Sequence, residues 1–240
     1  MWGAGVQIYV DFSGQRPMKN IHRMLEDIKQ ETQSTAFLTG RKALSPEVMA
    51  AMRKVPREQF VAPGMEPMAF DNGPLPIGYG QTISQPFIVA LMTDLLGAKL
   101  TDRILEIGTG SGYQSAILSL LAGQVYTVEV IEDLSVEAAA RFEKLGYRNI
   151  HVKTGNGYEG WPEQAPYDGV IVTAAAPYIP EPLIAQLKAG GRLVIPVGRP
   201  FEHQELIVLE KQEHGDNKLG KILDVAFVPL VDKDHLKKWH

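Results

Sequence analysis

Residues 104–113 read ILEIGTGSGY in one-letter code, and residues 114–121 continue as QSAILSLL. An apolar run of strand length thus ends in three glycines at alternate positions, Gly108, Gly110 and Gly112, and passes into a stretch with apolar residues at helical spacing. This order of strand, tight glycine turn and helix opens a nucleotide-binding βαβ unit. Because glycine has no Cβ, the turn can adopt positive φ angles and a ligand can lie against its main-chain N–H groups.

A second apolar stretch, residues 124–130, ends in an acid. Glu129 follows Gly108 by 21 residues. In folds of this kind a carboxylate at that distance reaches a ribose and accepts hydrogen bonds from its hydroxyls. The turn and the acid together predict a ligand of the adenosine type.

The spacing of the glycines disfavours a dinucleotide. A dinucleotide turn reads G-x-G-x-x-G, and its third glycine would fall at Tyr113, a large side chain. The chain has no second such motif and no G-x-x-x-x-G-K-[ST] motif for a nucleoside triphosphate. The pattern Glu106-x-Gly108-x-Gly110-x-Gly112 instead resembles motif I of the Rossmann-like S-adenosylmethionine methyltransferases, whose ligand has no pyrophosphate.

Composition indicates an ordinary globular protein. Of the 240 residues, 45% are hydrophobic and 22% charged, and the net charge is −4, which disfavours a nucleic-acid or membrane partner. No apolar stretch approaches membrane-spanning length, and the N-terminus lacks the features of a secretory signal. With no cysteine there is no disulfide framework and no thiolate zinc site. We expect one methyltransferase domain over residues 1–240 in a reducing cytoplasm, with a helical cap and loop at 1–78 and a Rossmann-like core at 79–240.

The first third of the chain is expected to be helical and then irregular. Residues 1–16 show no clear period, whereas 17–35 predict an amphipathic helix and 46–55 a second helix after the capping residue Ser45. One further turn is expected at 57–61, and the proline- and glycine-rich residues 62–80 are expected to form an irregular loop. A helix then begins at Pro86, with Ser84 or Gln85 at its cap.

Strands and helices alternate along the remainder. A helix is expected over 132–145 with Gly146 ending it, then strands at 150–153 and 169–172, a helix at 182–187 and a strand at 193–195. Two strands joined by a polar turn, 205–210 and 222–227, predict an antiparallel pair. The expected fold is α/β, a doubly wound and mostly parallel sheet with an antiparallel pair at its C-terminal edge.

The segment PIGYGQTISQP at residues 76–86 resembles the region preceding motif I in protein-L-isoaspartate O-methyltransferases. The resemblance continues through 106–112, Glu129, 167–177 and 186–198, so that it spans roughly residues 17–231 in family order. It implies transfer of a methyl group from S-adenosyl-L-methionine to the free α-carboxylate of L-isoaspartyl residues in damaged proteins and peptides. The product would be S-adenosyl-L-homocysteine, and the role would be protein repair.

The resemblance also implies the site residues. Gln81, Thr82, Ile83 and Ser84 would lie between cofactor and substrate, with the Ser84 hydroxyl orienting the attacking carboxylate as the catalytic group. The other cofactor-binding residues implied are Glu106, Gly108, Gly110, Gly112, Glu129, Asn156 and Gly157. Glu106 would reach the methionyl amine or order the turn, or would be a buried strand-end acid bonded to main-chain N–H groups. Glu129 would hold the ribose hydroxyls.

One motif departs from the family. Where the family commonly has Gly-Asp-Gly, whose acid meets the adenine, this chain has Gly155-Asn156-Gly157. Asparagine keeps an acceptor oxygen for the adenine amino group, so cofactor binding is expected to survive.

Two other functions stay open at this point. The chain could be a related methyltransferase acting on a small molecule or nucleic acid, or a non-catalytic S-adenosylmethionine-binding protein. A nucleic-acid methyltransferase more often carries Asn/Asp-Pro-Pro-Tyr/Phe after its fourth strand, where this chain has Thr173-Ala174-Ala175-Ala176-Pro177. The six histidines show neither H-x-x-x-H spacing nor pairing with clustered acids, so no metal is expected. No feature of the sequence indicates an oligomeric state.

Overall fold

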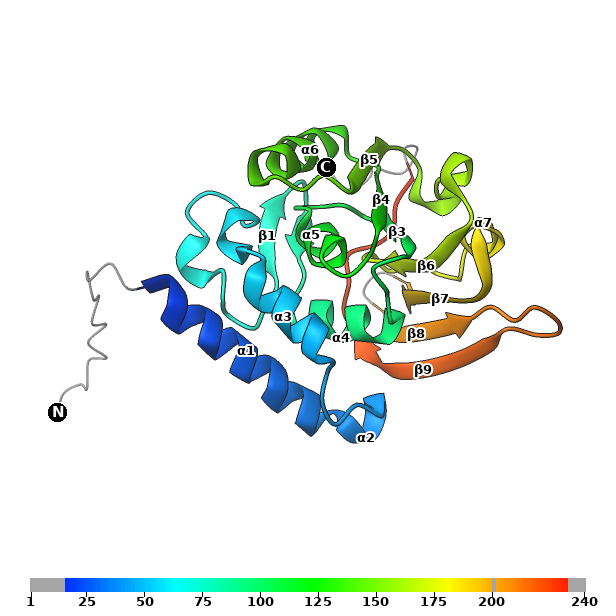
Figure 1. Ribbon diagram of the computed structural model, residues 1–240, viewed down its shortest axis with the longest axis horizontal. Helices are drawn as coiled ribbons and strands as arrows, with labels where there is room; N and C mark the ends of the chain where they lie inside the picture. Colours follow the sequence, from blue (N-terminus) through cyan, green and yellow to red (C-terminus); the bar gives the residue numbers. More distant parts are fainter. Residues whose placement is uncertain (1–15, 200–201, 233–240) are drawn as a thin grey trace.

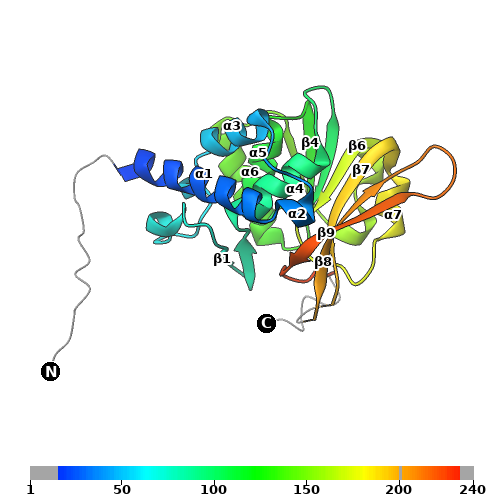
Figure 2. The ribbon, with the colours of Figure 1, turned by 90° about the horizontal axis from the view of Figure 1, so that it is seen from below.

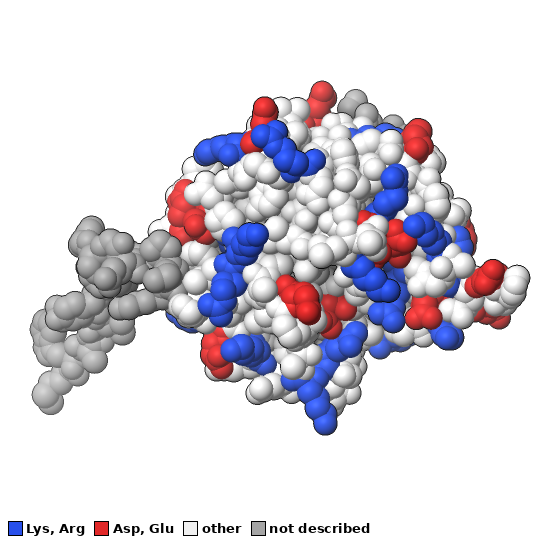
Figure 3. Space-filling view, viewed as in Figure 1, with Lys and Arg blue, Asp and Glu red and all other residues white. Residues whose placement is uncertain are grey.

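The computed structural model describes residues 16–199 and 202–232 (Figure 1). The loose N-terminus expected at 1–16 lies, apart from Arg16, outside the described residues. Within the described ranges, no helix combines the length and the apolar character needed to cross a membrane. On the face shown in Figure 3, basic and acidic side chains are interspersed.

The centre of the molecule is a seven-stranded sheet. Its order is β5-β4-β3-β6-β7-β8-β9, with neighbours from β5 to β7 parallel and β8 antiparallel to both β7 and β9. The strands are β3 Arg103–Ile107, β4 Gln124–Glu129, β5 Ile150–Thr154, β6 Tyr167–Val172, β7 Leu187–Val197, β8 Gln204–Glu210 and β9 Lys218–Val225. The expected sheet, including its antiparallel C-terminal edge, is confirmed.

The direction in which the chain adds strands reverses at β3. From β3 the chain proceeds to β4 and β5 on one side and then crosses back to place β6 on the other side of β3. Crevices outside the carboxyl ends of parallel strands at such a switch point are where α/β sheets bind ligands. The glycine turn directly after β3 lies at this point.

Alternating side chains along the strands supply two separate cores. Ile104, Val125 and Ile171 belong to a core shared with the helices of one face, whereas Leu105 and Val170 belong to a core on the other face. The first face carries α1 Arg16–Ser34, α3 Pro46–Lys54, α4 Pro86–Leu96, α5 Tyr113–Ser119 and α6 Glu132–Leu145. The second carries α7 Glu181–Ala185 and the 3-10 turn η3 Gly157–Glu159, and Trp161 and Ala165 on either side of the 3-10 turn η4 Pro162–Gln164 also pack there. In both ribbon views α1 lies alongside α4 on the outside of the first face (Figures 1 and 2).

Local signals account for the helix ends. The Ser45 hydroxyl accepts a hydrogen bond from the Val48 N–H and begins α3, as the sequence predicts. Helix α6 has Glu132 and Asp133 in its first turn and ends at Gly146, which has φ 79°. Its predicted bounds, 132–145, are confirmed.

The proline- and glycine-rich segment is more regular than expected. After η1 Arg57–Gln59 and η2 Glu66–Met68, residues Leu75–Gly78 (β1) and Gln81–Ile83 (β2) form an antiparallel hairpin apart from the main sheet. The expectation of an irregular loop through residue 80 was wrong over this part. A short helix, α2 Ala36–Thr39, follows α1.

Candidate active site

The glycine turn is fixed to the loop after β6. Gly108 has φ 94°, and a Cβ built on it would overlap the hydroxyl of Thr173. That hydroxyl donates to the carbonyls of Gly108, at 2.6 Å, and Ile107, at 3.0 Å. Glycine at 108 is therefore needed both for the positive φ and for the close approach of the β6 loop.

Glu129 connects the glycine turn to the end of β4. Its Oε2 accepts from the Gly110 N–H at 2.8 Å and its Oε1 from the Ile131 N–H at 3.0 Å. Burial raises the pKa of Glu129, and the main-chain N–H groups oppose that shift. Each carboxylate oxygen has a second lone pair, so Glu129, which lines a cavity, can accept further hydrogen bonds from a ligand.

The hairpin carries residues 81–84 to the opposite wall. Its turn places Gly78, Tyr79 and Gly80 at φ 93°, 55° and 69°. Within the described residues the Ser84 hydroxyl makes no hydrogen bond, so it is available to a ligand. The alternative that Ser84 caps α4 was wrong: the cap position is Gln85, without a side-chain bond.

A residue far from the cap position caps α4 instead. The Phe87 N–H donates to Oδ1 of Asn72 at 3.1 Å. The Nδ2 of Asn72 in turn donates to Oε2 of Glu31 at 2.6 Å, and that same oxygen accepts from Gln85 at 2.9 Å. A network between α1 and the start of α4 therefore supports the segment that ends at Ser84.

These walls enclose a cavity at the carboxyl ends of β3, β4 and β6. Eight of the residues expected at a cofactor site line it: Gln81, Thr82, Ile83, Ser84, Gly108, Gly110, Glu129 and Gly157. These eight residues come from four separate parts of the chain, which thus meet around one space.

The segment after β9 closes the cavity from another side. Val228–Val231 lines it, although no motif marks these residues. The segment returns there because the Ala175 N–H donates to Val228 O and the Leu230 N–H donates to Ala175 O, each at 2.8 Å. The loop after β6 thus positions a wall that sequence reasoning missed.

Glu106 lies behind the glycine turn and does not line the cavity. Its side chain is fully buried; Oε2 accepts from the Ser115 hydroxyl, and Oε1 has no partner among the described residues. Burial raises the pKa of Glu106 to about 8, which favours the protonated acid at neutral pH. Glu106 is thus a buried acid near the end of β3, but its hydrogen-bond partner is the Ser115 hydroxyl rather than a main-chain N–H. Contact of Glu106 with a methionyl amine stays a prediction.

Two further expected residues also lie away from the cavity lining. Gly112 has φ 87°, and a Cβ there would come within 2.5 Å of the Phe142 ring on α6, so this glycine permits helix packing. Asn156 begins η3: its Oδ1 accepts from the Tyr158 N–H and its Nδ2 donates to Glu159, each at 3.1 Å. Contact of Asn156 with an adenine stays a prediction.

Polar residues that the sequence analysis did not assign to the cofactor site also line the cavity. They are Thr109, Ser111, Tyr113 and Gln114. Tyr113 and Gln114 follow the glycine turn at the start of α5. Their position directly after a ligand-binding turn could have assigned them to the site from the sequence.

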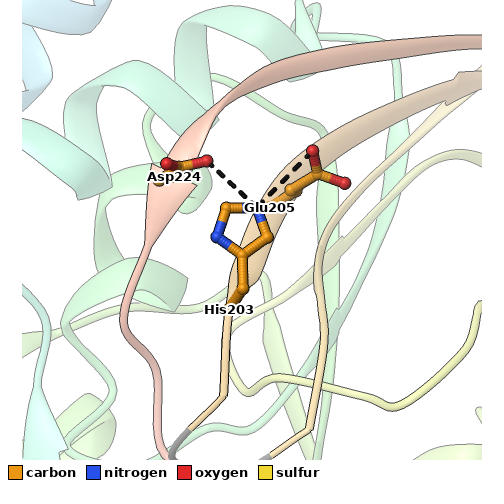
Figure 4. A group of neighbouring side chains, drawn as sticks. All are labelled: His203, Glu205 and Asp224. Carbon is orange, nitrogen blue, oxygen red and sulfur yellow. Dashed lines mark ion pairs between the residues drawn. The ribbon is translucent and has the colours of Figure 1, made fainter.

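One histidine does lie beside two acids, contrary to expectation. The Nε2 of His203 is 3.4 Å from Oδ1 of Asp224 and 3.7 Å from Oε1 of Glu205 (Figure 4). These three side chains could in principle ligate a cation. However, Lys221 Nζ lies 2.7 Å from Oε2 of Glu205 and lowers the pKa of that acid, so an ammonium already serves as its counter-ion. His235 and His240 lie outside the described residues, and the absence of a resident metal stays a prediction.

An open groove adjoins the cavity. The two spaces share Thr82, Ser84, Thr173 and Val228. The groove runs along the edge strand β9 and includes the exposed Phe37 of α2. Three acids and one lysine line it: Glu31, Glu205, Asp224 and Lys221. Ser84 is thus a residue at the junction of the cavity and the groove.

Comparison with known proteins identifies relatives over most of the chain. Residues 33–235 match the family model described as protein-L-isoaspartate(D-aspartate) O-methyltransferase. Protein-L-isoaspartate O-methyltransferase 2 of Syntrophobacter fumaroxidans is 53% identical over 209 residues, covering 87% of this chain and 85% of the relative. The protein of the same name from a Polaromonas species is 55% identical over 208 residues, covering 87% and 99%.

Solved structures show the same fold. One described as a protein-L-isoaspartate O-methyltransferase has a TM-score of 0.75 and 27% identity, covering 87% of this chain and 65% of its own. A second, from Plasmodium falciparum and in complex with S-adenosyl-L-homocysteine, has a TM-score of 0.73 and 23% identity, covering 88% and 98%.

Proposed function

The chain belongs to the protein-L-isoaspartate O-methyltransferase family, and from this premise we propose that it methylates the free α-carboxylate of L-isoaspartyl residues in damaged proteins and peptides. The methyl donor is S-adenosyl-L-methionine, and the product is S-adenosyl-L-homocysteine. We propose that residues 1–240 act as one methyltransferase domain. A cytoplasmic location stays a prediction, which fractionation of cells would test.

The junction of cavity and groove carries the proposal. Methyl transfer needs two ligands in contact, one enclosed and one arriving from solvent. Thr82, Ser84 and Thr173 line both spaces, so atoms of two ligands could meet beside them. A binding protein for a single ligand would not require this arrangement.

The cavity residues fit the proposed cofactor. Glu129 keeps lone pairs for two ribose hydroxyls, and Gly108 and Gly110 leave main-chain atoms open to the methionyl part. Glu106 is outside this lining, and we propose that it supports the turn from behind through Ser115 on α5. Gly157 lines the cavity beside Asn156, so the adenine would lie close to η3.

The residues around Ser84 would align the reaction. When bound, S-adenosyl-L-methionine supplies a methyl group on a sulfonium, open to in-line displacement. The substrate carboxylate is already ionised at neutral pH, so no general base is needed. The Ser84 hydroxyl would donate to that carboxylate and orient it, while Ile83 and the segment Val228–Val231 help to exclude water.

The groove suits an extended peptide rather than a small anion. It follows β9, the terminal strand of the sheet, and acids outnumber bases among its lining residues. This lining offers no charged pocket to hold a small anionic metabolite, whereas a peptide can be held by its main chain. Selectivity for isoaspartyl over aspartyl peptides would then depend on the position of the substrate carboxylate relative to Ser84.

The test compares two peptides that differ in one linkage. In isoaspartate the free carboxylate is attached to Cα, and in aspartate it is one methylene further out. We expect labelled methyl to pass to the isoaspartyl peptide with kcat/KM higher by about a hundredfold, because a displacement of roughly 1 Å can cost that much when alignment supplies catalysis. Equal kcat/KM for the two peptides, or no transfer to either despite tight cofactor binding, would overturn the proposal.

A further inference from the structure

Arg57 in η1 is buried without an acidic partner. Its side chain is 0% exposed, and within the described residues it forms no ion pair. Burial lowers its pKa from the ordinary value, and its Nη1 atom has no hydrogen-bond acceptor in the described part of the chain. Burying a cation without an ionic partner costs free energy, so the other contacts of Arg57 must offset this cost.

Arg57 donates hydrogen bonds to two main-chain carbonyls. Its Nε donates to Ala69 O at 2.7 Å, and its Nη2 donates to Ser84 O at 2.8 Å. The second bond fixes the backbone of the residue whose hydroxyl lies at the junction of cavity and groove. The planar guanidinium makes both bonds in one fixed geometry, which a lysine ammonium cannot reproduce.

The same guanidinium packs against Tyr113, the residue that follows the glycine turn. Its central carbon lies 4.7 Å from the centre of the Tyr113 ring, within the range of a cation–π contact. Tyr113 directly follows Gly112, is 1% exposed and lines the cavity. Phe60 holds the ring from another side, with ring centres 5.6 Å apart.

One side chain therefore connects the two walls that must be aligned. We propose that Arg57 is a positioning residue, which sets the Ser84 backbone against the cofactor turn through Tyr113. The role in turnover rests on the proposed methyl transfer. Arg57 does not touch either ligand space, so its effect would pass through Ser84 and Tyr113.

The test uses Arg57→Met and Arg57→Lys. Methionine removes the charge and both hydrogen-bond donors. Lysine keeps the charge but lacks the planar arrangement of donors, and this variant is used if the methionine variant does not fold. We expect kcat for the isoaspartyl peptide to fall by about tenfold to a hundredfold, with the Kd of S-adenosyl-L-homocysteine changed by less than about threefold. Amide hydrogen exchange over residues 81–88, measured with that ligand saturating, should become faster.

Arg103 offers a matched control at the opposite end of β3. Its Nη2 donates to the carbonyl of Gln164 at 2.7 Å, and its guanidinium lies 4.9 Å from the Tyr126 ring. Arg103→Met should lower Tm without changing kcat of the folded enzyme or exchange over 81–88. Equal kcat losses in the two methionine variants, or unchanged exchange over 81–88 in the Arg57 variants, would overturn the proposal. If the wild type methylates no isoaspartyl peptide, the proposed function fails, whereas the exchange comparison still decides whether Arg57 fixes this segment.

Discussion

The main-chain N–H of Gly110 donates a hydrogen bond of 2.8 Å to Oε2 of Glu129. This bond joins the glycine turn after β3 to the end of the neighbouring strand β4. The carboxylate that we propose for the ribose therefore also sets the shape of the turn. A change at Glu129 should affect both ligand binding and the stability of the turn.

Replacing Glu129 by alanine removes the acceptors of two main-chain donors and of the proposed ribose hydroxyls. Hydrogen bonds to a charged group contribute roughly 1.5–3 kcal/mol each, so the affinity for S-adenosyl-L-homocysteine should fall by about tenfold to several hundredfold. Titration calorimetry measures this loss, and thermal unfolding without ligand measures the loss of stability. Unchanged affinity in a folded variant would remove Glu129 from the ligand site.

Ser84→Ala should lower kcat with little change in Tm, because Ser84 does not cap α4 and its hydroxyl has no partner among the described residues. Ser45→Ala is the matched control, since the Ser45 hydroxyl accepts from the Val48 N–H at 3.3 Å. Its loss should cost about 1 kcal/mol of stability and leave kcat unchanged. Measuring Tm and kcat on both variants separates the two roles, and a normal kcat for Ser84→Ala would exclude the orienting role.

Glu106 should make stability depend on pH. Its folded pKa, about 8, lies above the ordinary value of 4.5. The contribution of Glu106 to the free energy of unfolding is therefore complete below the ordinary pKa. It is lost as the pH rises through the pKa of Glu106 in the folded protein. We expect the free energy of unfolding of the wild type to decline between about pH 5 and pH 8 more steeply than that of Glu106→Gln, which cannot ionise. Urea titrations across this range measure the difference, and parallel curves would contradict a raised pKa.

Two glycines with similar φ angles should respond differently to alanine. A Cβ at Gly112 would lie 2.5 Å from the Phe142 ring, whereas a Cβ at Gly146 meets nothing within 4 Å. Gly146→Ala should cost only the left-handed backbone strain, roughly 1–2 kcal/mol. Gly112→Ala must also displace α6, so the loss in free energy of unfolding, measured in urea, should be clearly larger than for Gly146→Ala. Equal losses would mean that α6 moves without cost.

Signals that lie within one element predicted the fold well. The bounds of α6 follow from acids in its first turn and Gly146 at its end, and the succession of strands along the chain follows from apolar runs between turns. The glycine turn and Glu129 could be paired from sequence because both follow parallel strands, whose carboxyl ends share one edge of the sheet.

Features that depend on distant partners could not be predicted in this way. Ser84 looked like a cap because nothing local shows that Asn72 caps α4 from 15 positions away. Glu106 looked like a ligand residue because spacing does not reveal that its side chain points to Ser115 rather than the cavity. Val228–Val231 has no motif, and only its pairing with the loop after β6 brings it to the site.

The Asn72 network also has a consequence for the chemical ageing of this protein. Asn72 is followed by Gly73, and such a pair cyclises readily because glycine leaves the next nitrogen unhindered. Here both side-chain atoms of Asn72 are held, one by Phe87 and one by Glu31, which restrains the amide from reaching that nitrogen. An isoaspartate at 72 would lengthen the backbone by one atom beside the start of α4 and bring a second carboxylate towards Glu31. The fold thus protects Asn72, which supports the active-site segment, from conversion to isoaspartate, the damage that we propose this enzyme repairs. Glu31→Ala should speed deamidation at position 72 in peptide maps of warmed protein, and an unchanged rate would contradict this shielding.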